Sequence, residues 1–446
     1  MPPPLDDSLP LLAHREPDEI VAWRGGRAVS AGEFLADVRA LSAALPRRRY
    51  LLNLCDDRYR FMVTLGAALL NGQITLLPPN RTERLLGQIE AAYPDLACVT
   101  EQAAALATGD SFVYPEALPA RAGPWMVPRI PARQTAALIF TSGSTGHPTP
   151  HVKPWRKLVA GARAAAETFA LRGPANFLGT VPPQHMWGLE ATVMLPMQLG
   201  GAVHACRPLF PSDVQEWLAA MPAPRVLVTT PIHIRACVED AAELPPLELI
   251  LSAAAPLAQG LARAAEARYG TRLVEIYGCT EAGMVASRRT AETGIWKVLG
   301  DTRVVRNGGE WAFAGKHIVG RVPTNDVLTM RSKREFLLVG RRADLVNVAG
   351  KRASLADLNR KLAEIPGVED GAFHAREAAS GRAARLMAFV VAPALSEAEI
   401  LNALRRSIDP AFLPRPLVKV DALPRAASGK LPVETLRALE LSVDEA

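Results

Sequence analysis

A loop rich in glycine and hydroxyl side chains follows the apolar run 136–140 and reads TSGSTGHPTPHVKP over residues 141–154. Gly143 and Gly146 permit tight backbone turns, and the hydroxyls and amides around them can surround phosphate oxygens. The loop lacks the Gly-Lys-Ser/Thr sequence of P-loop nucleotide triphosphatases, and its first lysine is Lys153. Taken alone, it predicts either a phosphate-binding site or a flexible turn.

Four further clusters carry side chains suited to nucleotide chemistry. In YGCTEAG, residues 277–283, Thr280 can contact a phosphate and Glu281 a Mg²⁺ ion, or Glu281 simply begins a helix. In PTNDVL, Asp326 can accept hydrogen bonds from two ribose hydroxyls, or is an ordinary turn aspartate. The other two clusters are residues 340–358 and the loop 423–432, whose Gly429-Lys430 would by itself be a solvated turn.

The elements that must position these clusters follow an alternating pattern. Strand-length apolar runs alternate with amphipathic helix-length runs, which predicts an α/β fold with a largely parallel sheet. Ligands bind at the carboxyl ends of strands in such sheets, so the loops after 137–140, 247–251 and 274–277 should lie on the ligand side. After residue 283 the short, glycine-bounded runs indicate antiparallel pieces. We place a boundary near residues 340–344, giving domains 1–342 and 343–446, with a disordered tail from residue 442.

Composition bounds the class of protein. The 446 residues suffice for two or more domains, and 49% hydrophobic with 22% charged residues is ordinary for globular proteins. A net charge of +6 suits an anionic small substrate or an acidic partner, and no dense basic run with interleaved aromatics favours nucleic acid.

The cysteines and apolar runs bear on the compartment. Five scattered cysteines without a CxxC pair disfavour a thiolate metal site and indicate a reducing compartment. The N-terminus lacks the features of a signal peptide, and the most apolar later run, 61–70, is too short to span a bilayer. These features predict a soluble, cytoplasmic protein without a membrane span.

The order and spacing of the five clusters resemble the adenylate-forming superfamily, which includes acyl- and aryl-CoA synthetases, adenylation domains of nonribosomal peptide synthetases, and luciferases. The loop pattern TSG(S/T)TGxPKG matches residues 141–148, YGxTE matches 277–281, and PRxxSGK matches 424–430 in full. The TGD motif matches loosely at 324–326, and the hinge motif GRxDDxIKxxG is met by Gly340, Arg341, Asp344 and Gly350. The resemblance covers essentially the whole chain. It implies a large N-terminal domain of mixed parallel sheets and helices plus a small, mobile α+β C-terminal domain.

The resemblance also implies a reaction and its cofactors. Family members use ATP and Mg²⁺ to convert a carboxylic acid to an acyl-adenylate and pyrophosphate, and most pass the acyl group to a phosphopantetheine thiol. Because two anions must meet in the first step, cations and amides placed where charge builds up lower the barrier by several kcal/mol.

Roles carry over by motif position. The hydroxyl and glycine loop, Thr141, Ser142, Gly143, Ser144, Thr145 and Gly146, would cradle the β- and γ-phosphates. Thr280 would contact the α-phosphate, and Glu281 with Thr145 would bind Mg²⁺. Asp326 and Arg341 would hold the ribose, Lys430 would bridge the carboxylate and the α-phosphate, and His185 would lie beside the acyl group or be a core histidine. The adenine and acyl pockets would be lined by Ala253, Ala254, Ala255, Tyr277 and Gly278.

The sequence departs from the family at the loop. Thr149 replaces its lysine and Pro150 the following glycine, and the nearest substitutes are His151 and Lys153. We expect Lys153 to reach the pyrophosphate, or alternatively to pack on Trp155 or cap the next helix. At the hinge, Ala343 takes a usual acidic position, so the pivot of the domain rotation can differ.

The chain is shorter than most stand-alone acyl-CoA synthetases, which favours a carrier-protein thiol over free CoA. It looks similar to AMP ligases of aryl-polyene or xanthomonadin-type pigment pathways. That likeness implies an aromatic or short acyl acid, such as a hydroxybenzoate, loaded onto an acyl carrier protein. A CoA ligase for an aryl or fatty acid, and a catalytically inactive nucleotide-binding protein, remain alternatives.

Overall fold

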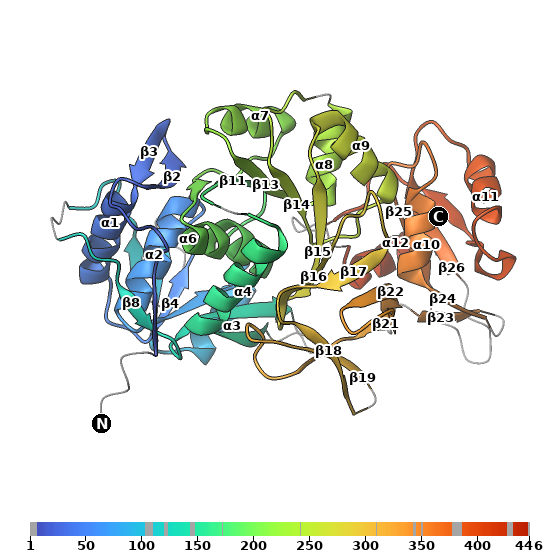
Figure 1. Cartoon of the computed structure of the whole chain (residues 1–446). Coiled ribbons are helices and arrows are strands. Elements are labelled where there is room, and N and C mark those ends of the chain that lie inside the picture. The colour runs from blue at the N-terminus through green and yellow to red at the C-terminus, as the bar shows by residue number, and fades with distance from the viewer. Residues whose placement is uncertain are drawn as a thin grey trace.

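The computed structural model describes residues 7–102, 110–119, 124–142, 148–171, 173–240, 242–308, 310–341, 345–348, 351–376, 386–425 and 431–444. Two large sheets make up the N-terminal part, and smaller sheets form the C-terminal part, at the right of Figure 1.

The first large sheet has six strands in the order β10-β9-β5-β4-β6-β7. Its strands are β4 (Tyr50–Asn53), β5 (Ile74–Leu77), β6 (Leu96–Thr100), β7 (Asp110–Val113), β9 (Thr135–Ser142) and β10 (Pro148–Pro154). All its neighbours pair in parallel except β9 and β10, which form an antiparallel hairpin. The helices connected to it are α1 (Ala31–Ala44), α2 (Arg58–Leu70), α3 (Glu83–Ala92) and α4 (Trp155–Thr168).

The second large sheet has eleven strands in the order β21-β22-β17-β16-β15-β14-β13-β11-β12-β2-β3. Its parallel centre comprises β2 (Ile20–Arg24), β11 (Asn176–Gly179), β12 (Ala202–His204), β13 (Arg225–Thr229), β14 (Leu249–Ser252) and β15 (Leu273–Cys279). Its antiparallel strands are β3 (Arg27–Ser30), β16 (Gly283–Arg288), β17 (Ile295–Val298), β21 (Asp326–Met330) and β22 (Glu335–Arg341). The change to antiparallel pairing after residue 283 confirms the prediction made from the glycine-bounded runs.

Helices cover both faces of this sheet. One face packs with α7 (Pro211–Ala219), α8 (Pro231–Glu239) and α9 (Gln259–Tyr269) in an apolar cluster (Figure 1). The other face joins the main core, to which α1, α2, α4, α5 (Met186–Leu189), the π-helix Glu190–Met194 and α6 (Leu195–Leu199) contribute. Helix α2 is buried over nearly its whole circumference because it lies inside this core, which explains its continuous apolar sequence.

Two minor sheets complete the N-terminal part. They are the pair β1 (Ser8–Pro10) and β8 (Arg129–Pro131), and the three strands β18 (Arg303–Asn307), β19 (Glu310–Ala314) and β20 (Val322–Pro323).

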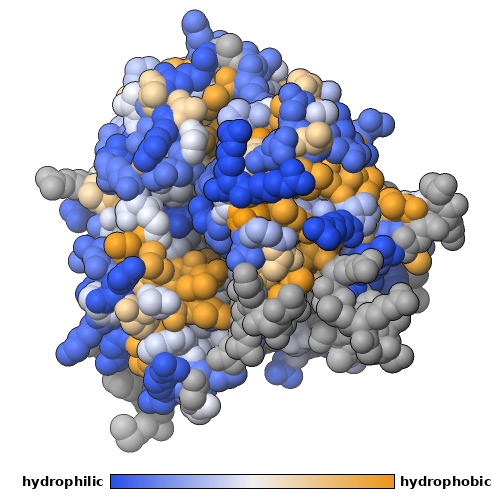
Figure 2. Space-filling view, turned by 90° about the vertical axis from the view of Figure 1, so that its right-hand side faces the viewer, coloured by the Kyte–Doolittle hydropathy of each residue, from blue (hydrophilic) through white to orange (hydrophobic). Residues whose placement is uncertain are grey.

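The C-terminal part builds cores of its own. Its elements are β23 (Leu345–Val348), β24 (Lys351–Ser354), α10 (Leu355–Ala363), β25 (Asp370–Ala375), β26 (Leu386–Val391), α11 (Glu397–Arg405), the 3₁₀ turn Pro410–Phe412, β27 (Leu417–Lys419) and α12 (Val433–Asp444). The buried apolar residues of two clusters come entirely from residues after 345. On this side of the molecule, apolar surface lies in patches between hydrophilic groups (Figure 2). Helix α12 continues to Asp444, so the prediction of disorder from residue 442 is wrong for residues 442–444.

Candidate functional site

The carboxyl ends of β13, β14 and β15 lie side by side at one edge of the second sheet. The segment after β14 carries Ala253, Ala254 and Ala255, and Ala254 has a φ of 75°. A left-handed alanine is strained, and such residues persist where the surrounding structure requires them, which often happens at binding sites. The structure thus places the predicted adenine segment at the edge where ligands bind in α/β sheets.

Glycine is required within the Tyr277–Glu281 motif. Gly278 lies opposite Met284 at an irregularity of the β15–β16 pairing. A Cβ atom there would lie 2.4 Å from the carbonyl oxygen of Gly283, which no side chain permits. Gly278 therefore lets the two strands approach closely, just before the turn that carries Thr280 and Glu281.

The β9–β10 hairpin brings a histidine to this turn. The ring nitrogen Nε2 of His151 lies 3.0 Å from Thr141 Oγ1 and 3.6 Å from Glu281 Oε1. Burial lowers the pKa of His151, although the Glu281 carboxylate opposes that shift, so the ring is neutral at pH 7. Thr141, His151 and Glu281 thus converge from three separate segments.

Glu281 has the character of an available anion. Its side chain is 43% exposed. Partial burial tends to raise its pKa, but hydrogen bonds from its own backbone and from Cys279, together with the charges near it, outweigh burial and lower the pKa. The carboxylate is therefore ionised at neutral pH and accessible to a cation.

Lys153 occupies a different environment from the one expected of a pyrophosphate ligand. Only 4% of the residue is exposed, and Nζ donates a 2.9 Å hydrogen bond to the main-chain oxygen of Glu281. Burial lowers its pKa, and the carboxylate of Glu190 is the largest charge opposing that shift. The contact with pyrophosphate stays a prediction, while His151 is the side chain of β10 that lies beside Thr141 and Glu281.

Glu190 was not predicted from the sequence. It begins the π-helix, is 4% exposed, and accepts a 2.9 Å hydrogen bond from the amide of Met284. Burial raises its pKa to about 7 against the opposing effects of Lys153 and the Met284 amide. The signal in the sequence was a lone carboxylate inside the apolar run 186–197, since such a group needs a partner when buried.

Tyr277 and Asp326 form a second contact at the site. The tyrosine hydroxyl donates to the Asp326 carboxylate and lies 3.2 Å from Thr324 Oγ1, which also accepts from the Asp326 amide at 3.0 Å. The ring of Tyr277 packs edge-on against Phe313 and Phe336. Burial and the carboxylate raise the pKa of Tyr277 far above its ordinary value, so its hydroxyl remains a donor. Asp326 is thereby held in one orientation.

His185 lies at the end of the segment after β11. It precedes helix α5, is half-buried, and its carbonyl accepts from the Leu189 amide at 2.8 Å. Two residues on, the Trp187 indole donates to the Thr229 carbonyl at the end of β13 at 3.2 Å. The same edge of the sheet therefore carries the predicted acyl-pocket histidine.

Several predicted site residues lie outside what the structure describes. These are Gly143, Ser144, Thr145, Gly146 and Lys430, together with the side chains of Ser142 and Arg341. Their assigned roles stay predictions. Among the described residues, no group of three His, Cys, Asp or Glu side chains could hold a metal ion. A single accessible carboxylate, Glu281, fits Mg²⁺ bound through one protein oxygen plus phosphate oxygens and water.

Residues 12–308 match the profile of the family described as AMP-binding enzyme. The chain belongs to the AMP-binding enzyme family. It is 30% identical over 319 residues to a 4-coumarate–CoA ligase of Halorhodospira halophila, covering 67% of this chain and 76% of the relative. It is 26% identical over 402 residues to an indoleacetate–CoA ligase of Aromatoleum aromaticum, covering 80% of this chain and 77% of the relative.

Solved structures have the same fold. An O-succinylbenzoate–CoA synthetase of Bacillus subtilis, in complex with ATP and magnesium ion, matches with a TM-score of 0.81 at 19% identity. The match covers 94% of this chain and 97% of the other. ATP-bound MatB of Rhodopseudomonas palustris has a TM-score of 0.79 at 18% identity, covering 96% and 97%. The predicted superfamily and fold class are confirmed, and the protein is an AMP-forming acid–thiol ligase. The narrower likeness to pigment-pathway ligases stays a prediction.

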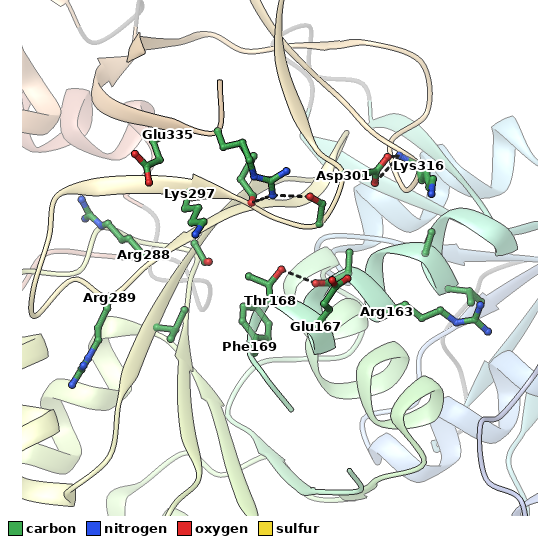
Figure 3. A pocket seen from close by; sticks show the side chains of 18 of the residues that line it. Arg163, Glu167, Thr168, Phe169, Arg288, Arg289, Lys297, Asp301, Lys316 and Glu335 are labelled. Atoms are coloured by element: carbon green, nitrogen blue, oxygen red, sulfur yellow. Dashed lines mark hydrogen bonds between the residues drawn. The ribbon is translucent and has the colours of Figure 1, made fainter. Parts of the chain in front are cut away.

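A groove of about 1190 Å³ lies elsewhere, between α4 and the strands β15 to β17. Its lining includes Arg163, Lys297, Lys316, Glu167 and Asp301, labelled in Figure 3. None of the motif residues that converge around Glu281 lines it. This basic groove is therefore separate from the candidate active site. In the described part of the chain, no helix is long and apolar enough to cross a membrane.

Proposed function

We propose that this ligase activates an aromatic or short acyl acid and transfers the acyl group to the thiol of CoA. The observation that carries the chemistry is the convergence of Thr141, His151 and the accessible Glu281 carboxylate beside the rigid Tyr277–Asp326 pair. The CoA acceptor is supported by the relatives, which include ligases named for 4-coumarate and indoleacetate, both aromatic acids.

In this proposal the hydroxyls and amides of residues 141–146 surround the β- and γ-phosphates of ATP. Glu281, with Thr145, holds Mg²⁺, and Thr280 contacts the α-phosphate. Asp326 and Arg341 hold the ribose hydroxyls. Because the Asp326 carboxylate is already oriented by Tyr277, binding the ribose costs little further ordering.

Both steps require the C-terminal part. Lys430, from residues 343–446, would bridge the carboxylate and the α-phosphate during adenylation, the first step. The proposed small domain would then rotate about the segment near residue 340 to expose the adenylate to the thiol. The separate apolar clusters after residue 345 support such independent movement.

A carrier-protein thiol is the second candidate acceptor, and one experiment separates the two. Pyrophosphate release is measured over a panel of carboxylic acids without acceptor, with CoA, and with holo-carrier protein. We expect acid-dependent release and an acyl-CoA product for an aromatic acid. Thioester formed only on the carrier protein would transfer the proposal to the second candidate.

The variant that tests the Mg²⁺ site is Glu281→Gln, which keeps the size of the side chain and removes its charge. We expect this variant to need a higher Mg²⁺ concentration for half-maximal pyrophosphate release. Absence of release from the unaltered protein with every acid would instead favour an inactive nucleotide-binding protein.

A further inference from the structure

The turn that carries Thr280 and Glu281 is held at two points by buried charged side chains. Lys153, from β10, donates through Nζ to the Glu281 carbonyl oxygen at 2.9 Å. Glu190, from the π-helix, accepts from the Met284 amide through Oε2 at 2.9 Å. Both side chains are about 96% buried, at 4% relative exposure each. The lysine side chain thus holds the carbonyl before Gly283, and a buried carboxyl group holds the amide after it.

Other contacts close around the same backbone. His317 Nε2 lies 2.9 Å from the Met284 carbonyl oxygen, so this nitrogen is the protonated one of the neutral ring. Helix α4 packs directly on these groups, because a Cβ at Gly161 would be in ordinary contact with Glu190 Oε1 at 3.4 Å and with His317 Cβ at 3.6 Å. Gly283 is in the left-handed region, with a φ of 78°. The turn is therefore enclosed by four separate elements.

The chemistry of the contacts favours a positional role. Hydrogen bonds to charged groups are stronger than neutral ones, and burial strengthens them further. A buried charge is costly to keep without a function or a partner, and both charges here use a hydrogen bond on the main chain of one turn. Groups that orient a metal ligand from behind usually affect metal affinity by about 10- to 100-fold.

We propose that Lys153 and Glu190 are positioning residues that fix the Glu281 turn from both ends and so set the direction of the Glu281 carboxylate. The inference rests on the proposed function in one respect, namely that Glu281 binds the Mg²⁺ of the nucleotide. Lys153 then acts through the main chain of Glu281 and contacts no phosphate itself. In this role, Lys153 contributes a contact to the Glu281 main chain in place of the phosphate contact expected of the loop lysine.

The test uses the full chain with three changes at the pair. Lys153→Met and Glu190→Leu each remove one contact and leave the other charge buried. The double variant removes both charges, which relieves the electrostatic cost of an unpaired buried ion. We expect the double variant to regain thermal stability relative to the single variants. We also expect it to keep a half-saturating Mg²⁺ concentration roughly tenfold above that of the unaltered protein.

Two controls separate positioning from general stability. Lys419→Met removes a lysine of the C-terminal part, whose Nζ donates to the carbonyl oxygen of Leu395 at 2.6 Å, away from the turn. It should leave the Mg²⁺ dependence unchanged. Glu190→Gln keeps an oxygen that can accept from the Met284 amide, so it should restore most of the affinity lost in Glu190→Leu.

Amide hydrogen exchange provides a readout that needs no activity. The Met284 amide should exchange at least about tenfold faster in Glu190→Leu and in the double variant, and near the unaltered rate in Lys419→Met. A double variant with unaltered exchange at Met284 and unaltered Mg²⁺ dependence would overturn the proposal. If the unaltered protein released no pyrophosphate, the proposed function would fail. Unaltered exchange of the Met284 amide in Glu190→Leu would separately contradict the positioning role of Glu190.

Discussion

Replacing Gly283 by alanine should destabilise the large domain more than the same change at a glycine in open surroundings. A Cβ at residue 283 would lie 2.4 Å from Glu190 Oε1 and 3.1 Å from Met186 Cε. Restoring an ordinary contact of 3.4 Å requires the carboxylate to move by about 1.0 Å, the difference between 3.4 and 2.4 Å. That movement breaks the 2.9 Å hydrogen bond from the Met284 amide.

The expected cost has two parts. The left-handed conformation costs an alanine about 1–2 kcal/mol, offset by about 0.4–1 kcal/mol because the unfolded chain becomes less flexible. Loss of a hydrogen bond to a charged group adds about 1.5–3 kcal/mol. Gly270, with a φ of 60° and nothing within 4 Å of an added Cβ, provides the matched control. Gly270→Ala should cost about 1 kcal/mol and Gly283→Ala about 2–4 kcal/mol by the same terms.

Urea denaturation followed by tryptophan fluorescence measures the difference, because all seven tryptophans lie at or before residue 311. The double variant Glu190→Ala with Gly283→Ala supplies the coupling. In the Glu190→Ala background, Gly283→Ala should cost no more than Gly270→Ala. Equal losses for the two single glycine variants would refute the reasoning, because the Glu190 contact would then add nothing.

Three further outcomes are expected. Tyr277→Phe removes the hydroxyl that orients Asp326, so the KM for ATP should rise roughly tenfold or more in steady-state assays. An unchanged KM would contradict the ribose-binding role of Asp326. Gly340→Ala should destabilise the protein because its Cβ would lie 1.9 Å from Ser354 Oγ and 2.5 Å from Ser354 Cβ. Adding Ser354→Gly should recover most of the lost melting temperature, and no recovery would count against this contact. His204 is 7% exposed, and burial together with the nearby Arg58 charge lowers its pKa to about 4. As pH falls below 6.5, this histidine therefore takes up a proton in the unfolded chain before it does so in the folded protein. Stability should therefore decrease from pH 6.5 to 4 by about 2–3 kcal/mol from this group, and urea titrations of His204→Phe should show a correspondingly smaller decrease.

The sequence predicted those parts of the site that depend on order along the chain. The apolar run before Thr141 and the one before Tyr277 predicted strands, and the structure places both motifs where those strands end. Local composition was sufficient there because a short apolar run followed by small or polar residues is typical of a strand that ends in a loop. The superfamily followed from the spacing of five motifs and needed no tertiary information.

The residues behind the site could not be predicted in the same way. The partner of Lys153 depends on the hairpin register, which sets Lys153 opposite Ala137 and turns it inward. Glu190 is adjacent to Met284 only because the π-helix packs between α4 and β16, segments separated by over a hundred residues. A period along the sequence reports which face is buried but does not identify the groups that meet there.

Strand β10 also has a consequence for how copies of the chain behave toward one another. In the described part of the chain it is an outermost strand of the six-stranded sheet, and it contains Pro148, Pro150 and Pro154. Proline lacks the amide proton that a further strand would need, and edge prolines are a known protection against strand addition. Pro150, which replaces the usual glycine of the loop, thus acts with the other two prolines to make this edge of the sheet a poor template for aggregation during folding.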